Sequence, residues 1–250
     1  MAAEPIIETQ SVGKVFGGFK ALTNVSVKVQ AGILTSIIGP NGAGKSTFFN
    51  LLSGAFAPSA GRVLFQGRDI TGMRAHEFAH IGIAKSFQIT NLFPNFTALE
   101  NVRIALQAHV CRYALWRRRS DLQGLTEKSM SLLETVGLAP RARHLARELA
   151  HGQQRALEIA VALAADPKLL LMDEPTAGMS PEETQVMMAL IRKLVGERSV
   201  VLVEHKMKMV MGISERIVVL HHGELIAEGR PEDIRSNELV KRVYLGQGNH

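Results

Sequence analysis

A glycine-rich segment followed by lysine and serine is the part of this sequence best suited to bind a charged ligand. Residues 39–46 read GPNGAGKS and fit the pattern G-x-x-x-x-G-K-[ST]. Glycines let the backbone approach phosphates closely, so that successive N–H groups point inward and the following helix adds its positive end. Lys45 is expected to reach the β- and γ-phosphates of a nucleotide, and Ser46 to place its hydroxyl on Mg²⁺. The predicted nucleotide-binding residues are Gly39, Pro40, Asn41, Gly42, Ala43, Gly44, Lys45, Ser46 and Thr47.

Two acidic residues end a short apolar run further along the chain. Leu169 to Met172 has the length of a strand buried on both faces, and Asp173 and Glu174 follow it directly. We expect this strand to end beside the place where a neighbouring strand delivers the glycine-rich segment. Asp173 would then hold the Mg²⁺ shell, and Glu174 would polarise the attacking water. Together the two segments predict a site that binds MgATP and hydrolyses it.

Three other segments occur in a fixed order around these two. Phe87-Gln88 follows the glycine-rich segment, Leu149 to Gln153 precedes the acidic strand, and Val203-Glu204-His205 comes after it. In this order the five segments resemble the Walker A, Q-loop, signature, Walker B and switch-histidine motifs of ABC ATPases. The similarity covers nearly the whole chain.

A narrower resemblance comes from segments around and between these motifs. They are similar to segments of the ATP-binding subunits of branched-chain amino acid importers. The resemblance implies ATP-driven uptake of branched-chain or related amino acids through separate membrane subunits. The segments are Phe-Gly-Gly at 16–18, Pro-Thr-Ala-Gly-Met-Ser-Pro-Glu-Glu-Thr at 175–184, Glu-His-Lys-Met at 204–207, Val-Met-Gly-Ile-Ser at 210–214 and Tyr-Leu-Gly at 244–246.

The family resemblance also implies roles for single residues and for partners. Phe16 would stack on adenine, Gln88 would sense Mg²⁺ and the attacking water, and His205 would contact the γ-phosphate. Family members work as head-to-tail pairs, in which each ATP lies between one subunit's glycine-rich segment and the other's signature. The implied partners are a second ATPase subunit, two membrane permease subunits and, indirectly, a solute-binding protein, at the cytoplasmic face of the inner membrane. The implied Mg²⁺ set is Ser46, Gln88 and Asp173, and the residues acting in the partner's site are Leu149, Ala150, His151, Gly152 and Gln153.

This chain departs from the family's usual pattern at two places. The usual signature is Leu-Ser-Gly-Gly-Gln, whereas Ala150 and His151 stand at its second and third positions. In the family, the hydroxyl of that serine binds the partner's γ-phosphate, and this chain lacks it. A hydrogen bond to a charged group stabilises a complex by about 1.5 to 3 kcal/mol. The usual aspartate after the acidic strand is replaced by Ser180. We therefore expect two unequal ATP sites in a heterodimer, the weaker one using this chain's signature.

The pattern of apolar residues predicts the elements that position these motifs. Alternation within Ile6 to Gly32 indicates an antiparallel β layer. Ile33 to Ile38 is expected to be a buried strand, followed after the glycine-rich loop by a helix at 45–52 that stops at Gly54. The predicted fold class is α/β, a P-loop NTPase core with a mainly parallel sheet, an N-terminal antiparallel layer and inserted helices, as in ABC ATPases. The predicted organisation is one domain over 1–250, with a helical subdomain at about 90–165 and a closing hairpin and helix at 216–246.

Composition narrows the class of protein further. Hydrophobic residues make up 46% of the 250 residues, which suits one large globular domain, and the apolar runs are too short to cross a membrane. The first eight residues lack a secretory pattern and Cys111 is a single cysteine, so we expect a cytoplasmic location. The net charge of +6 would permit a nucleic-acid partner. Because no motif that reads DNA or RNA accompanies the arginine runs, such as the one around Trp116, no nucleic-acid partner is expected.

Three alternative functions fit single features of the sequence. His76-Glu77-Phe78-Ala79-His80 fits the zinc-hydrolase motif H-E-x-x-H, but no obvious third ligand accompanies it and it lies inside the ATPase motif series. A non-transport ABC ATPase acting on DNA or ribosomes would fit the basic charge, yet neither a long coiled-coil insertion nor a second cassette is visible. A low-turnover regulatory module would fit Ala150 and His151, whereas Glu174 and His205 favour catalysis.

Overall fold

The computed structural model describes residues 4–86, 92–110 and 119–245. The predictions for Gln88 and for Cys111 fall outside these ranges, and so do three of the arginines around Trp116, namely Arg112, Arg117 and Arg118. In chain order the elements are β1 (Pro5–Phe16), β2 (Phe19–Gln30), β3 (Leu34–Ile38), α1 (Lys45–Leu52), β4 (Ala60–Phe65), β5 (Arg68–Asp69), α2 (Ala75–Ile81), β6 (Ile83–Ser86), α3 (Ala98–Val110), α4 (Arg119–Thr135), the 3₁₀ turns η1 (Ala139–Arg141) and η2 (Ala146–Glu148), α5 (His151–Leu163), β7 (Leu169–Asp173), α6 (Pro181–Leu194), β8 (Ser199–Val203), α7 (Met207–Ile213), β9 (Arg216–His221), β10 (Glu224–Gly229), α8 (Pro231–Ser236) and α9 (Glu238–Leu245).

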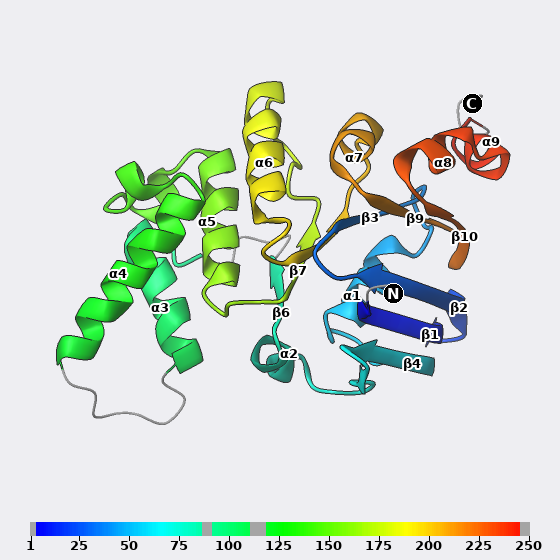
Figure 1. Ribbon diagram of the computed structural model, residues 1–250, viewed down its shortest axis with the longest axis horizontal. Helices are drawn as coiled ribbons and strands as arrows, with labels where there is room; N and C mark the ends of the chain where they lie inside the picture. Colours follow the sequence, from blue (N-terminus) through cyan, green and yellow to red (C-terminus); the bar gives the residue numbers. More distant parts are fainter. Residues whose placement is uncertain (1–3, 87–91, 111–118, 246–250) are drawn as a thin grey trace.

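Two β-sheets carry these elements (Figure 1). One is antiparallel, with the strand order β2-β1-β4-β5. The other has the order β10-β9-β3-β8-β7-β6, and all its neighbours run parallel except β9 and β10. The structure therefore contains both the mainly parallel core and the antiparallel layer that the sequence predicts.

The strand that ends in the acid pair does not neighbour the strand that leads into the glycine-rich segment. β8 lies between β3 and β7 and pairs in parallel with both. Our expectation of direct neighbours was wrong, because equally apolar strands carry no local signal of their order in the sheet. The acid pair nevertheless lies on the side of the glycine-rich loop, since parallel strands all end at the same edge.

Strand β7 is apolar along its whole length because both of its faces are covered. Leu169 and Leu171 pack with α1 and the strands around it, whereas Leu170 and Met172 pack with α5 and α6. All four side chains are fully buried. Burial on both faces stabilises the strand end that presents Asp173 and Glu174.

Helices α3, α4 and α5 pack against one another and lie on the opposite side of the molecule from β1, β2 and β4 (Figure 1). Together with α6 they form one buried apolar cluster that reaches the sheet. Among the described residues, no helix is long and apolar enough to cross a membrane.

Candidate functional site

The glycine-rich loop leads into the N-terminus of α1. Gly44 caps this helix with a φ of 94°, and a Cβ there would lie 2.8 Å from the carbonyl oxygen of Ala21, so only glycine fits. Neither a side-chain cap nor an acidic residue occupies the first turn of α1. The positive end of the helix is therefore available to an anion.

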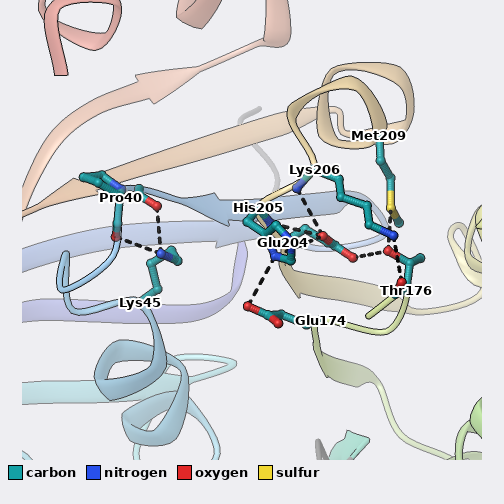
Figure 2. Close-up of polar contacts among 9 residues, drawn as sticks. Pro40, Lys45, Glu174, Thr176, Glu204, His205, Lys206 and Met209 are labelled. Atoms are coloured by element: carbon teal, nitrogen blue, oxygen red, sulfur yellow. Dashed lines mark hydrogen bonds and ion pairs between the residues drawn. The ribbon is translucent and has the colours of Figure 1, made fainter. Parts of the chain in front are cut away.

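Lys45 points back onto the loop that precedes it (Figure 2). Its Nζ donates to the carbonyl oxygens of Gly39 at 2.7 Å and Pro40 at 2.9 Å. Burial lowers the pKa of Lys45, and the nearby carboxylates of Glu174 and Asp173 oppose that shift. The loop's own carbonyls thus hold the ammonium group at the site.

The loop encloses a cavity of about 310 Å³ that Glu174 also lines. Phe19, which the sequence reasoning missed, lines it as well and is 70% exposed. Phe16, the predicted adenine platform, packs edge-on against Phe56 with ring centroids 5.3 Å apart. Phe16 and Phe19 flank the turn Gly17-Gly18 on either side. This symmetric placement was the signal in the sequence that could have pointed to Phe19. From the loop itself, the lining residues are Asn41, Gly42, Ala43, Gly44, Lys45, Ser46 and Thr47.

The acid pair divides into a buried and a more accessible carboxylate. Asp173 is only 9% exposed, whereas the Glu174 side chain keeps 28% exposure. The Glu174 backbone is in the left-handed region at φ 44°, and its N–H donates to the carbonyl of Val203 at 2.9 Å. This turn at the end of β7 directs the Glu174 side chain into the cavity.

His205 comes from the loop after β8 and lies beside Glu174 (Figure 2). Its Nδ1 is 3.4 Å from Glu174 Oε1, and its side chain is 56% exposed. The structure therefore brings together two of the predicted catalytic residues, which are separated by a helix and a strand in the sequence.

Burial raises the pKa of the Asp173 carboxyl above its ordinary value, and nearby Lys85 opposes the rise. An acid with a raised pKa destabilises the folded state above that pKa, and the penalty disappears as the pH falls below the unfolded-state value. Asp173→Asn is therefore expected to raise the melting temperature of the metal-free protein at neutral pH. Melting curves recorded from neutral pH down to about pH 3.5 test this, because the difference should vanish below an ordinary aspartate pKa of about 3.9. A difference that is constant with pH would contradict it.

Lys85 is a second residue that the sequence reasoning missed. It pairs in register with Leu171, so it shares a sheet face with Asp173, two residues further on. Its Nζ donates to Asn50 Oδ1 on α1 at 2.7 Å and lies 4.9 Å from the centre of the Phe49 ring. The signal in the sequence that could have pointed to Lys85 was a lysine inside a buried strand, because a buried ammonium group needs hydrogen-bond or charge partners.

The signature segment lies at the start of α5 and lines a different cavity, of about 390 Å³. Ala150 is the N-cap and offers no side-chain hydrogen bond, while its own N–H donates to Gln153 Oε1 at 3.1 Å. The N–H of Gly152 donates to Glu183 Oε1 at 3.3 Å. A carboxylate from α6 therefore already occupies the positive end of α5, in contrast to the open end of α1. Of the remaining signature residues, Leu149 is buried and His151 is exposed.

Ser180 stands at the N-cap of α6. Its hydroxyl accepts from the N–H of Glu183 at 3.2 Å, and its own N–H donates to Glu183 Oε2 at 3.0 Å. Serine is among the best N-cap residues, as is the aspartate it replaces. The second departure from the family pattern thus preserves the start of the helix.

The H-E-x-x-H segment forms α2. Glu77 accepts a hydrogen bond from the N–H of Arg74 at 3.0 Å and so caps the start of that helix. Within the described part of the chain, no group of three His, Cys, Asp or Glu side chains is arranged to hold a metal ion.

Comparison with known proteins gives consistent matches over the whole length. A family described as "ABC transporter" matches residues 22–177, and one described as "Branched-chain amino acid ATP-binding cassette transporter" matches 224–250. The chain is 41% identical to the high-affinity branched-chain amino acid transport ATP-binding protein BraF of Pseudomonas aeruginosa, covering 98% of this chain and 99% of that one.

Solved structures show the same likeness. MJ1267, an ATP-binding cassette of an ABC transporter, has a TM-score of 0.85 at 33% identity, covering 97% of this chain and 99% of that one. A dimeric post-hydrolysis state of the cassette MJ0796, bound to ADP and Pi, has a TM-score of 0.76 at 30% identity, covering 90% and 98%. These similarities confirm the fold class predicted from the sequence.

Proposed function

The chain belongs to the family of ATP-binding subunits of ABC transporters, and from this premise we propose that it binds and hydrolyses MgATP to drive the import of branched-chain or related amino acids. The substrate class is supported by the name of the relative from Pseudomonas aeruginosa and by the match at residues 224–250. The observation that carries the ATPase function is that Glu174 lines the cavity of the glycine-rich loop and has His205 beside it.

Binding of the nucleotide is assigned to the loop and the aromatic turn. The open end of α1 and the loop amides would hold the phosphates, and Lys45 would leave its carbonyl partners to bind the β- and γ-phosphates. Phe16 and Phe19 offer aromatic faces for adenine. Ser46 and Asp173 are hard oxygen donors of the kind that Mg²⁺ prefers, and Gln88 would complete the set. When bound, Mg²⁺ would neutralise charge on the β- and γ-phosphates.

Hydrolysis would follow from the position of the two catalytic side chains. Glu174 would accept a proton from a water molecule while the water oxygen attacks the γ-phosphorus. The bond from that phosphorus to the β–γ bridging oxygen breaks, leaving ADP and phosphate. Lys45 and His205 would stabilise the charge on the transferred group.

The proposed assembly contains a second ATPase subunit and two membrane permease subunits, and it works with a solute-binding protein. This chain would lie peripherally on the cytoplasmic face of the inner membrane. The dimeric form of the related cassette MJ0796 supports the pairing of ATPase subunits.

Unequal ATP sites follow as part of this proposal. Ala150 and His151 lack the serine hydroxyl of the usual signature, and Glu183 adds a negative charge where a partner's γ-phosphate would approach. Like charges in such proximity weaken binding. We therefore propose that the site built from this chain's signature and the partner's loop turns over more slowly than the other.

Uptake measurements test the proposed substrate. Cells lacking this chain should lose uptake of radiolabelled leucine, isoleucine and valine, and the wild-type chain should restore it, whereas Lys45→Ala should not. Copurification of the native assembly would identify the membrane subunits. Normal uptake of all three amino acids without the chain, combined with intact ATPase activity of the purified protein, would refute the substrate class but not the ATPase function.

A further inference from the structure

A fully buried carboxylate stands directly before His205 and has no role in the steps described so far. Glu204 is 0% exposed. Its Oε2 accepts from the backbone N–H groups of His205 at 3.0 Å and Lys206 at 3.3 Å. Its Oε1 accepts from the hydroxyl of Thr176. Three donors therefore stabilise a charge that burial would otherwise make costly.

A second contact joins the same two loops in the opposite direction. Lys206 Nζ donates to the carbonyl oxygen of Thr176 at 2.8 Å, and Thr176 is itself 0% exposed (Figure 2). Both polar groups of Thr176 that face this loop are thus bound, one by Glu204 and one by Lys206. We call these three residues the Thr176 clamp.

The loops that the clamp joins carry the two catalytic side chains. Glu174 stands two residues before Thr176, and His205 stands between the two clamp residues of the other loop. The last hydrogen bond of the β7–β8 pairing ties the Glu174 N–H to Val203. Beyond that point the loops are joined by the clamp and by the approach of His205 to Glu174, and the Thr176 hydroxyl also lies 3.6 Å from Met209 Sδ in α7.

We propose that the Thr176 clamp positions Glu174 and His205 as one unit on the γ-phosphate, so that neither side chain moves without the other. The inference rests on the proposed ATPase function of the same site. Its members are positioning residues, because they act through Glu174 and His205. A displacement of about 1 Å in a reacting group can lower a rate by about a hundredfold, so a fixed spacing between the two side chains matters.

A purely structural clamp would give a different result. Glu204 also satisfies backbone N–H groups just before α7, so its loss could lower stability alone. In that case the turnover number of each folded molecule would stay unchanged. Turnover per folded molecule, measured separately from ATP binding, distinguishes the two roles.

Thr176→Val removes the hydroxyl and keeps the shape of the side chain. We expect the turnover number of the full chain with MgATP to fall by about tenfold to a hundredfold. The Kd for ATP should stay within about threefold, because no clamp residue is among the described residues that line the cavity of the glycine-rich loop. Thr176→Ser retains the hydroxyl and should restore most of the turnover.

Thr9→Val is the matched control. Thr9 is 2% exposed in β1, and its hydroxyl oxygen accepts from the N–H of Val27 at 3.0 Å. The same chemical change is therefore made at a buried threonine outside the site, and stability should fall while turnover per folded molecule stays normal. If Thr176→Val matched Thr9→Val in turnover, the clamp proposal would be wrong.

Lys206→Met provides a second test should Thr176→Val fail to fold. It breaks only the other arm of the clamp, and Lys208→Met at an exposed neighbour is its control. The clamp is supported if Lys206→Met reduces turnover and Lys208→Met does not. It is overturned if the two variants have the same turnover number per folded molecule. A wild-type chain that neither binds nor hydrolyses ATP would instead refute the proposed function.

Discussion

Lys45→Ala is expected to lower the ATPase rate by about a hundredfold or more, since one well-placed donor to developing charge contributes that much. The Kd for ATP should rise by about one to two decades, because a hydrogen bond to a charged group stabilises by about 1.5 to 3 kcal/mol. The structure adds a reason for this large effect. The ammonium group is already at the site, held by the carbonyls of Gly39 and Pro40, and among the described residues no other lysine lines this cavity.

The measurements are steady-state hydrolysis and equilibrium binding of ATP in magnesium buffer. Lys193→Ala is the matched control, because Lys193 Nζ also donates to a backbone carbonyl, that of Thr135 at 3.3 Å, far from the cavity. It should leave both quantities near the wild-type values. Normal turnover in Lys45→Ala would show that the assigned loop is not the nucleotide site.

Glu174→Gln is expected to lower the turnover number by about a hundredfold to ten-thousandfold while ATP still binds. Glutamine keeps the size of the side chain but cannot accept a proton from water. Single-turnover hydrolysis gives the chemical step, and equilibrium binding gives the affinity. Glu127→Gln, on the exposed surface of α4, makes the same change of charge elsewhere and should have no effect. A Glu174→Gln variant with normal single-turnover rates would remove Glu174 from the mechanism.

The same substitution also tests the unequal sites in the assembled pair. Glu174→Gln here disables the site that uses this chain's loop, and the matching substitution in the partner disables the site that uses this chain's Ala150 and His151. The first change should cost more of the total turnover than the second. Equal losses would count against asymmetry.

Much of the site could be predicted because its parts are local. The glycines, Lys45 and Ser46 lie in one strand, loop and helix, and the acid pair ends one apolar run. The spacing of apolar residues, the length of apolar runs and the positions of glycines are properties of neighbouring residues, so they can be recognised without knowing the fold. The positions of Phe16 and His205 came from family resemblance, and the structure places His205 against Glu174.

The strand order could not be predicted in the same way. Strands β3, β7 and β8 are short, apolar and buried on both faces, and nothing in their residues says which lies in the middle. The expected adjacency of the acidic strand and the loop strand was wrong for this reason.

By itself, the sequence determined the chemistry available to this protein: an anion-binding loop, an acid pair, and a signature without its serine. Only the tertiary structure decided which groups are already engaged, because a hydrogen bond forms between residues that folding brings together, whatever their separation along the chain. The carboxylate of Glu183 at Gly152 and the hydroxyl of Thr176 at Glu204 are such contacts, between residues 31 and 28 positions apart.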